Sequence, residues 1–98
     1  MATHRLKSTN STEILAAYAA NIAYESLPSE AVIALNRVVL DTLGTAVAAT
    51  TLGAGCRELV EVIRGMGGTA ESTIIGFGDQ VPAAHAAYVN GGLAHALN

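Results

Sequence analysis

The chain has 98 residues, enough for one small domain and too few for two. It is 51% hydrophobic but only 4% aromatic and 13% charged, so Ala, Val, Leu and Ile supply the apolar mass, as in closely packed helices. A net charge of −3 with scattered cations excludes the clustered basic face of a nucleic-acid-binding domain. So few charges indicate that much of the surface is covered by other polypeptide.

The cellular setting is predicted from the cysteine count and from the apolar runs. A single cysteine, Cys56, excludes an internal disulfide, and the polar start has no apolar signal region; both favour a cytoplasmic location. Two apolar runs, 42–56 and 80–98, are candidates for membrane-spanning segments. The first is too short and is interrupted by Thr and Gly, and the second contains two histidines and two asparagines, so we expect no membrane segment.

Residues 1–9 form a polar lead-in, and two helices are predicted after it. The first begins after a cap at Asn10 or Ser11 and runs to about residue 25. The second begins at Pro28 and carries apolar residues nearly all round as far as about residue 48, which predicts a central, buried helix with a loop at 50–55 after it. Gly44 in its middle is expected to let another helix cross closely, and Arg37 and Asp41 are spaced to pair or to stand as solvated charges.

A third helix is predicted over Cys56–Met66, with one apolar and one charged face, ending at Gly67. Residues 72–77 are β-branched and bounded by glycines, which predicts one short extended segment. A final helix follows, capped by Asp79 or Gln80, and Gly91-Gly92 is expected to weaken or bend it. The predicted fold is all-α: residues 1–98 form a single N-terminal helical segment of a larger domain, with at most one extended segment near 72–77.

The last eighteen residues, VPAAHAAYVNGGLAHALN, contain no charged Asp, Glu, Lys or Arg but do contain two histidines, two asparagines and a tyrosine. Uncharged polar groups on an apolar segment are costly to bury without partners, so this tail is expected to line a pocket or a polar core. It stops without a turn or cap, and we expect the other half of the pocket to lie elsewhere. No metal-ligand set, nucleophile elbow or other complete catalytic constellation is present, so we name no catalytic residue and no metal ligand.

Three stretches resemble the MmgE/PrpD family, which includes 2-methylcitrate dehydratase and cis-aconitate decarboxylase. They are LDTLG at 40–44, IGFG at 75–78 followed by VPAAHAA at 81–87, and NGGLAHALN at 90–98, which is similar to the family's N-G-x-x-x-H-A-L ahead of D-F-D-D-T. The resemblance covers nearly the whole chain in the family's order. Asn98 stands where the first Asp of D-F-D-D-T falls, so one carboxylate is replaced by a neutral amide.

The resemblance implies the N-terminal part of a lyase or isomerase that removes a proton next to a carboxylate of a small polycarboxylate, by dehydration, decarboxylation or epimerisation. It implies no metal or organic cofactor, a homodimer, and proton-transfer residues later in the chain. Asn90, His95 and Asn98 are expected near the substrate pocket, as orienting groups, and the 98 residues alone are expected to be inactive. The missing parts would come from the rest of the enzyme or from a complementary chain. The alternative is a small helical interaction module that docks through its alanine-rich face.

Overall fold

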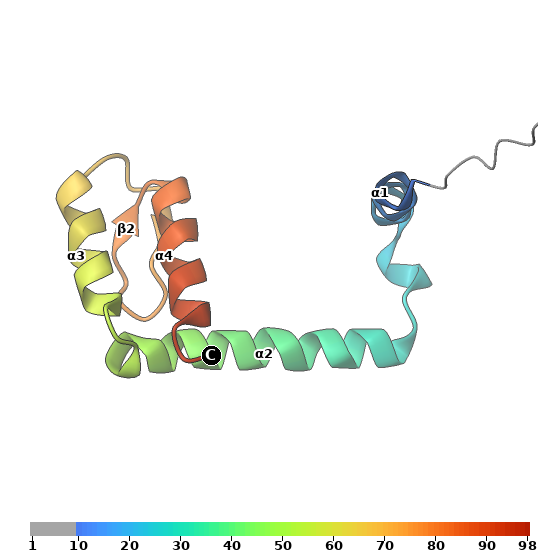
Figure 1. Cartoon of the computed structure of the whole chain (residues 1–98), viewed down its shortest axis with the longest axis horizontal. Helices are drawn as coiled ribbons and strands as arrows, with labels where there is room; N and C mark the ends of the chain where they lie inside the picture. Colours follow the sequence, from blue (N-terminus) through green and yellow to red (C-terminus); the bar gives the residue numbers. More distant parts are fainter. Residues whose placement is uncertain (1–9) are drawn as a thin grey trace, which may run out of the picture. The chain divides into compact units, whose positions relative to one another are not determined.

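The computed structural model describes residues 10–98, and the predicted lead-in over residues 1–9 lies outside the described residues. The elements are α1 (Ser11–Asn21), the short 3-10 helix η1 (Tyr24–Ser26), α2 (Ser29–Leu52), α3 (Cys56–Met66), β1 (Ser72–Thr73), β2 (Gln80–Val81) and α4 (Ala83–His95), as drawn in Figure 1. The mainly helical fold is therefore confirmed. The chain divides between Ile33 and Ala34 into two compact units, which are described separately.

The first unit contains α1 and η1 and has no buried residue in either helix. Asn10 caps α1 as predicted, because its Oδ1 accepts a hydrogen bond from the Thr12 N–H at 3.1 Å. The predicted end near residue 25 is wrong. The helix ends at Asn21 because Ile22 adopts an extended backbone, and η1 follows as a separate turn.

Helix α2 is long and apolar but exposed, which contradicts the prediction of a buried central helix. Of its 24 residues only Ala46 and Ala49 are buried. Most of its large apolar side chains are exposed, and Leu40 is 73% exposed. An added Cβ at Gly44 would meet no atom within 4 Å, so no described helix crosses there.

By length and composition alone, α2 is the one described helix that could cross a membrane, a property it shares with core helices of soluble proteins. The prediction of no membrane segment concerned two other runs, 42–56 and 80–98, and it stays a prediction. Arg37 and Asp41 lie near the middle of α2, and both are exposed. They form no ion pair within the part of the chain that the structure describes.

The predicted loop at 50–55 is shorter than expected, since α2 continues to Leu52. Thr50 and Thr51 remain helical because their hydroxyls donate to the carbonyls of Val47 and Ala48, at 2.7 and 3.3 Å. Only Gly53–Gly55 connect α2 to α3; Gly53 leaves room for the Cys56 Sγ, and Gly55 has a φ of +77°. The third helix has the predicted bounds and ends at Gly67.

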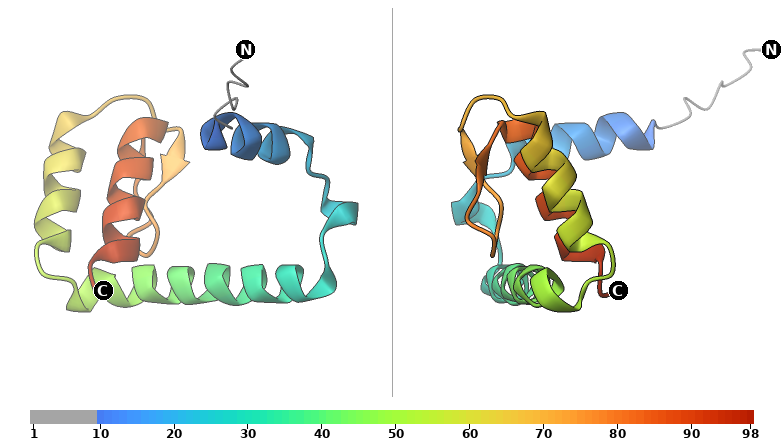
Figure 2. Two further views of the ribbon diagram at one scale, coloured as in Figure 1. Left: turned by 45° about the vertical axis from the view of Figure 1, so that its right-hand side comes forward. Right: turned by 90° about the vertical axis from the view of Figure 1, so that its left-hand side faces the viewer.

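The second unit has one small core between α3, α4, the hairpin and the last turns of α2. Figures 1 and 2 show α3 and α4 side by side with the hairpin against α4, which agrees with the contacts between these elements. Four large side chains are almost completely inaccessible: Val60, Ile74, Val89 and Leu93. Ala46 and Ala49 join this core from α2. This packing fixes the position of α4 within the unit.

The region predicted as one extended segment is a two-stranded hairpin. Strand β1 pairs antiparallel with β2, with Ser72 opposite Val81 and Thr73 opposite Gln80. Residues 75–77 form the turn rather than a strand, and Gly76 and Gly78 have φ near +80°. Gln80 therefore belongs to a strand and does not cap the last helix.

Helix α4 is continuous through Gly91 and Gly92, so the expected bend is absent. Pro82 occupies its N-cap position without a side-chain cap bond. The cap comes instead from Glu71, whose Oε2 accepts a hydrogen bond from the Ala83 N–H at 3.1 Å. A carboxylate is favourable there because the helix dipole is positive at its N-terminus.

Candidate functional site

The residues predicted for the pocket all lie on the second half of α4 and just after it, but they do not form one cluster. Asn90 and His95 are five positions apart, which is about 140° around a helix. Asn90 lies on the side that faces the hairpin and is half-buried, whereas His95 and Asn98 are exposed. The structure therefore separates Asn90 from the other two.

Asn90 binds the backbone of the hairpin with both ends of its amide. Its Oδ1 accepts from the Ile75 N–H at 2.9 Å, and its Nδ2 donates to the Thr73 carbonyl at 3.1 Å. Each end of the amide thus has one backbone partner, and one acceptor position and one N–H remain. The structure places Asn90 as a structural amide rather than as a lining group.

His95 and Asn98 lie together where α4 ends. His95 is the last helical residue, and the Asn98 N–H donates to its carbonyl at 3.1 Å. Both side chains face solvent in the described part of the chain. An imidazole N–H and an amide N–H can each donate a hydrogen bond to a carboxylate, and imidazole can also transfer a proton.

His85, one of the two histidines noted in the tail, is half-buried on α4. Its Nδ1 is buried and has no hydrogen-bond partner among residues 10–98. The structure places it on the buried side of α4, away from the open end with His95.

Arg64 and Asp79 form a bidentate ion pair between α3 and the hairpin. The Arg64 Nε and Nη2 donate to the two oxygens of Asp79 at 2.6 and 2.8 Å, and the guanidinium lies 5.8 Å from the centre of the Phe77 ring. The hydrogen bond from Arg64 holds the pKa of Asp79 below its usual value, and the same bond raises the pKa of Arg64. Arg64 is thus occupied by an internal partner.

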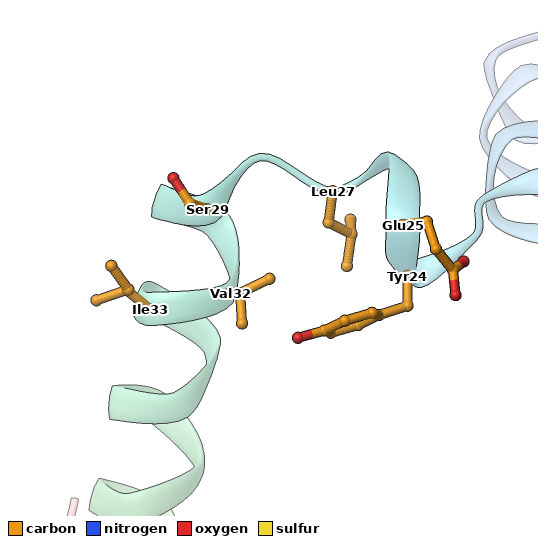
Figure 3. A pocket seen from close by; sticks show the side chains of 6 residues that line it. All are labelled: Tyr24, Glu25, Leu27, Ser29, Val32 and Ile33. Atoms are coloured by element: carbon orange, nitrogen blue, oxygen red, sulfur yellow. The ribbon is translucent and has the colours of Figure 1, made fainter.

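A pocket of about 360 Å³ lies in the first unit, where η1 leads into α2. Its lining residues are Tyr24, Glu25, Leu27, Ser29, Val32 and Ile33. Figure 3 shows Tyr24, Leu27 and Val32 turned toward one another, with the Glu25 carboxylate pointing away. The pocket has an apolar floor and offers no cation, so its chemistry suits an apolar group and not a polycarboxylate.

The described residues do not supply the charges that a polycarboxylate requires. Binding such a substrate takes cations aimed at its carboxylates. Arg64 is engaged by Asp79, and Arg37 and Arg57 are exposed on two different helices, α2 and α3. Within residues 10–98 no group of three or more His, Cys, Asp or Glu side chains is placed to hold a metal ion.

The fold and the tail thus define a mainly helical unit that carries an imidazole and an amide at the open end of its last helix. A family model described as MmgE/PrpD N-terminal domain matches residues 13–98. The chain therefore belongs to the MmgE/PrpD family, as its N-terminal domain. Comparisons with curated proteins and with solved structures give no match.

Sequence reasoning named His95 and Asn98 as pocket residues, which stays a prediction, and it missed the polar contacts around α4 and the hairpin. Arg64 and Asp79 are fifteen residues apart, as are Asn90 and Ile75, and Glu71 lies twelve residues before Ala83. No local spacing rule links residues at these separations. Only the turn glycines at 76 and 78 signalled that the chain reverses there and brings the partners together.

Proposed function

We propose that this chain is the N-terminal part of a lyase or isomerase that acts on a small polycarboxylate. The reaction would begin with removal of a proton next to a carboxylate and would proceed by dehydration, decarboxylation or epimerisation. The observation that carries this proposal is the match of the MmgE/PrpD N-terminal domain over residues 13–98. The family is one of dehydratase-like enzymes. The resemblance of this chain to the family suggests a substrate of the 2-methylcitrate type.

His95 and Asn98 are proposed as the contribution of this chain to the substrate pocket. Their support is position: both are exposed at the end of α4, and Asn98 is tied to the His95 carbonyl. A neutral amide at position 98 can donate to a substrate carboxylate, whereas an aspartate there would repel it. Proton abstraction itself is assigned to groups outside these 98 residues, because no base and cation converge in the described part.

The partners follow from the same proposal. The remainder of the enzyme, or a complementary chain, would cover the exposed apolar residues of α2 and supply the cations. We further propose a cytoplasmic homodimer that needs no cofactor, no nucleic acid and no membrane. In support, Arg37 and Asp41 near the middle of α2 would each cost about 2.5–3.5 kcal/mol at the centre of a bilayer.

A second candidate is a helical interaction module. The exposed face of α4 carries small residues, Ala83, Ala84, Ala87 and Gly91. A bare face of this kind allows another helix to approach closely. This candidate predicts a stable complex with a helical partner and no chemistry on small acids.

The test is deuterium incorporation by the native protein, isolated from its source cells, in D₂O with a panel of citrate-type acids. Reversible proton abstraction exchanges the hydrogen next to a carboxylate, whichever product follows. The proposal predicts deuterium in at least one acid, detected by mass spectrometry. A native protein that labels and consumes no member of the panel would contradict it and favour the interaction module.

A matched pair of variants tests whether His95 acts in the site or only as part of helix α4. His95→Gln is expected to lower the exchange rate by up to about 10²-fold, because it removes an imidazole that orients the substrate. Tyr88→Phe changes an exposed residue on the same helix and is expected to leave the rate unchanged. Equal effects of the two changes would remove His95 from the site.

A further inference from the structure

The contact between Asn90 and the hairpin joins the helix with the candidate site to the most deeply buried part of the hairpin. Asn90 Oδ1 and Nδ2 bind the Ile75 N–H and the Thr73 carbonyl, which flank Ile74. Ile74 is completely buried in the core. The Asn90 amide therefore binds the backbone on both sides of the buried residue Ile74.

The backbone polar groups next to Ile74 each have a specific hydrogen-bond partner. The Ile74 N–H donates to the Asp79 carbonyl and its own carbonyl accepts from the Gly78 N–H, both at 2.9 Å, so Ile74 is bonded across the turn. The Ile75 N–H, in contrast, has Asn90 as its acceptor and no backbone acceptor in the described chain. Removing the amide leaves that donor without its partner.

The direction of the amide is fixed by chemistry. The oxygen has to face the N–H of Ile75 and the nitrogen has to face the carbonyl of Thr73, because the opposite orientation would place like groups together. One side chain therefore acts as acceptor and donor at the same time. Only an amide, or a neutral carboxylic acid, has that pair of functions at this length.

We propose that Asn90 is a positioning residue, whose amide locks α4 to the backbone of residues 73–75 and so sets where His95 and Asn98 stand. His95 follows Asn90 by five residues on the same continuous helix, about 7.5 Å along its axis. A rotation or slide of α4 would move the end of the helix by a comparable amount. The inference rests on the proposed function only for the task of His95 and Asn98.

The test uses Asn90→Asp and Asn90→Ala in the 98-residue chain, followed by NMR. Near neutral pH the introduced carboxylate can accept from Ile75 but cannot donate to Thr73, and it repels that carbonyl. Once protonated, near or above the ordinary carboxyl pKa of about 3.9, it regains both functions. The readouts are hydrogen exchange at the Ile75 amide and the backbone shifts of His95, each relative to the unaltered chain at the same pH.

At pH 7 both variants are expected to raise Ile75 exchange by about tenfold or more. At pH 4 the Asn90→Asp excess is expected to shrink as the carboxyl group becomes protonated, while the Asn90→Ala excess remains, and the His95 shifts are expected to follow the same pattern. Gln80→Ala is the matched control, because it removes the neighbouring bond from Gln80 Nε2 to Thr73 Oγ1 at 2.5 Å and leaves the Asn90 contacts alone.

If Asn90→Ala unfolds the chain, Asn90→Asp carries the test by itself, since the same protein is compared at two pH values. A pH-independent Asn90→Asp excess, or His95 shifts that stay unchanged while Ile75 exchange rises, would overturn the positioning role. No substrate enters this experiment. Its failure is therefore distinguishable from a failure of the proposed reaction, which deuterium labelling of the acids reports.

Discussion

At the scale of single residues, three polar side chains connect segments that are distant in the sequence. Asn90 and Glu71 bind backbone groups, and Arg64 binds the carboxylate of Asp79 through its Nε and Nη2. All three act on the hairpin or on the helix that follows it. These polar contacts add to the small core, which contains Val89 and Leu93, in holding α4 in place.

The Arg64–Asp79 pair makes the stability of the second unit depend on pH. The pKa of Asp79 is lower in the folded chain than its ordinary value of 3.8 because it accepts hydrogen bonds from Arg64. A group with a lowered folded pKa stabilises the fold fully above its unfolded pKa, and that contribution is lost as the pH falls through the folded pKa.

We therefore expect Asp79→Asn to lower the melting temperature at pH 7 and to have progressively less effect as the pH falls below about 4. Asp41→Asn is the control, because it is the same substitution at an exposed aspartate that forms no ion pair within the described residues. Thermal unfolding from pH 7 to pH 3 measures both. An Asp79→Asn effect of equal size at all pH values would show that the ion pair is not its cause.

At the scale of elements, the hairpin turn is seated against the end of α2. Gly76 has a φ of +80°, and a Cβ there would collide with Cγ2 of Thr50. Gly78 has nearly the same φ, +81°, but open space around it. Comparing substitutions at Gly78 and Gly76 therefore distinguishes the cost of backbone strain, which both share, from the cost of a steric clash, which arises only at Gly76.

Gly78→Ala is expected to cost about 1–2 kcal/mol in free energy of unfolding, from the left-handed backbone alone. Gly76→Ala is expected to cost about 1–3 kcal/mol more, because the turn is also pushed away from α2. Thr50→Ser, which removes Cγ2 and keeps the hydroxyl bonded to Val47, should recover most of that extra cost. Urea unfolding measures all three, and equal costs for the two alanine variants would contradict the seating of the turn.

The elements differ in how far they follow from local sequence. The third helix was predicted to the residue because its apolar and charged faces alternate with helical period and Gly67 ends it. The end of α2 was missed because Thr50 and Thr51, typical loop residues, bond their own helix. Strand β2 was missed because two residues between a turn and a proline carry no strand pattern.

The candidate site was predictable only in part, for a related reason. The uncharged polar groups of the tail marked α4 as unusual. The structure leaves His95 and Asn98 exposed at its end, and their place in a pocket stays a prediction. The occupation of Asn90 by Thr73 and Ile75 depends on how the chain folds back, and no residue near Asn90 in the sequence signals it. The polar amide was found, and its partners were not.

At the scale of the whole molecule, the exposed apolar residues are the feature that most needs an explanation. Seventeen large apolar side chains are exposed among residues 10–98, and eight of them lie on α2 from Ile33 to Leu52. An apolar pattern predicts that a helix is buried, but it does not say against what. For α2 only Ala46 and Ala49 are buried among the described residues, so the prediction of burial was wrong for this helix.

The exposed stripe and the isolated imidazole at the end of α4 have one common explanation. Under the proposed function, other polypeptide covers α2 and also brings cations and a base to His95 and Asn98. An unshielded apolar helix and an incomplete site are then two aspects of the same missing surface. The membership of the chain in the MmgE/PrpD family supports this account, since the match is to an N-terminal domain.

The most direct measurement is turnover by the purified 98-residue chain mixed with citrate-type acids, followed by NMR for elimination, decarboxylation or epimerisation products. The account predicts that no product forms, because the described residues bring neither a base nor converging cations to His95 and Asn98. Turnover that copurifies with the chain and is abolished by His95→Gln would show that these residues form a complete active site, and it would contradict the account.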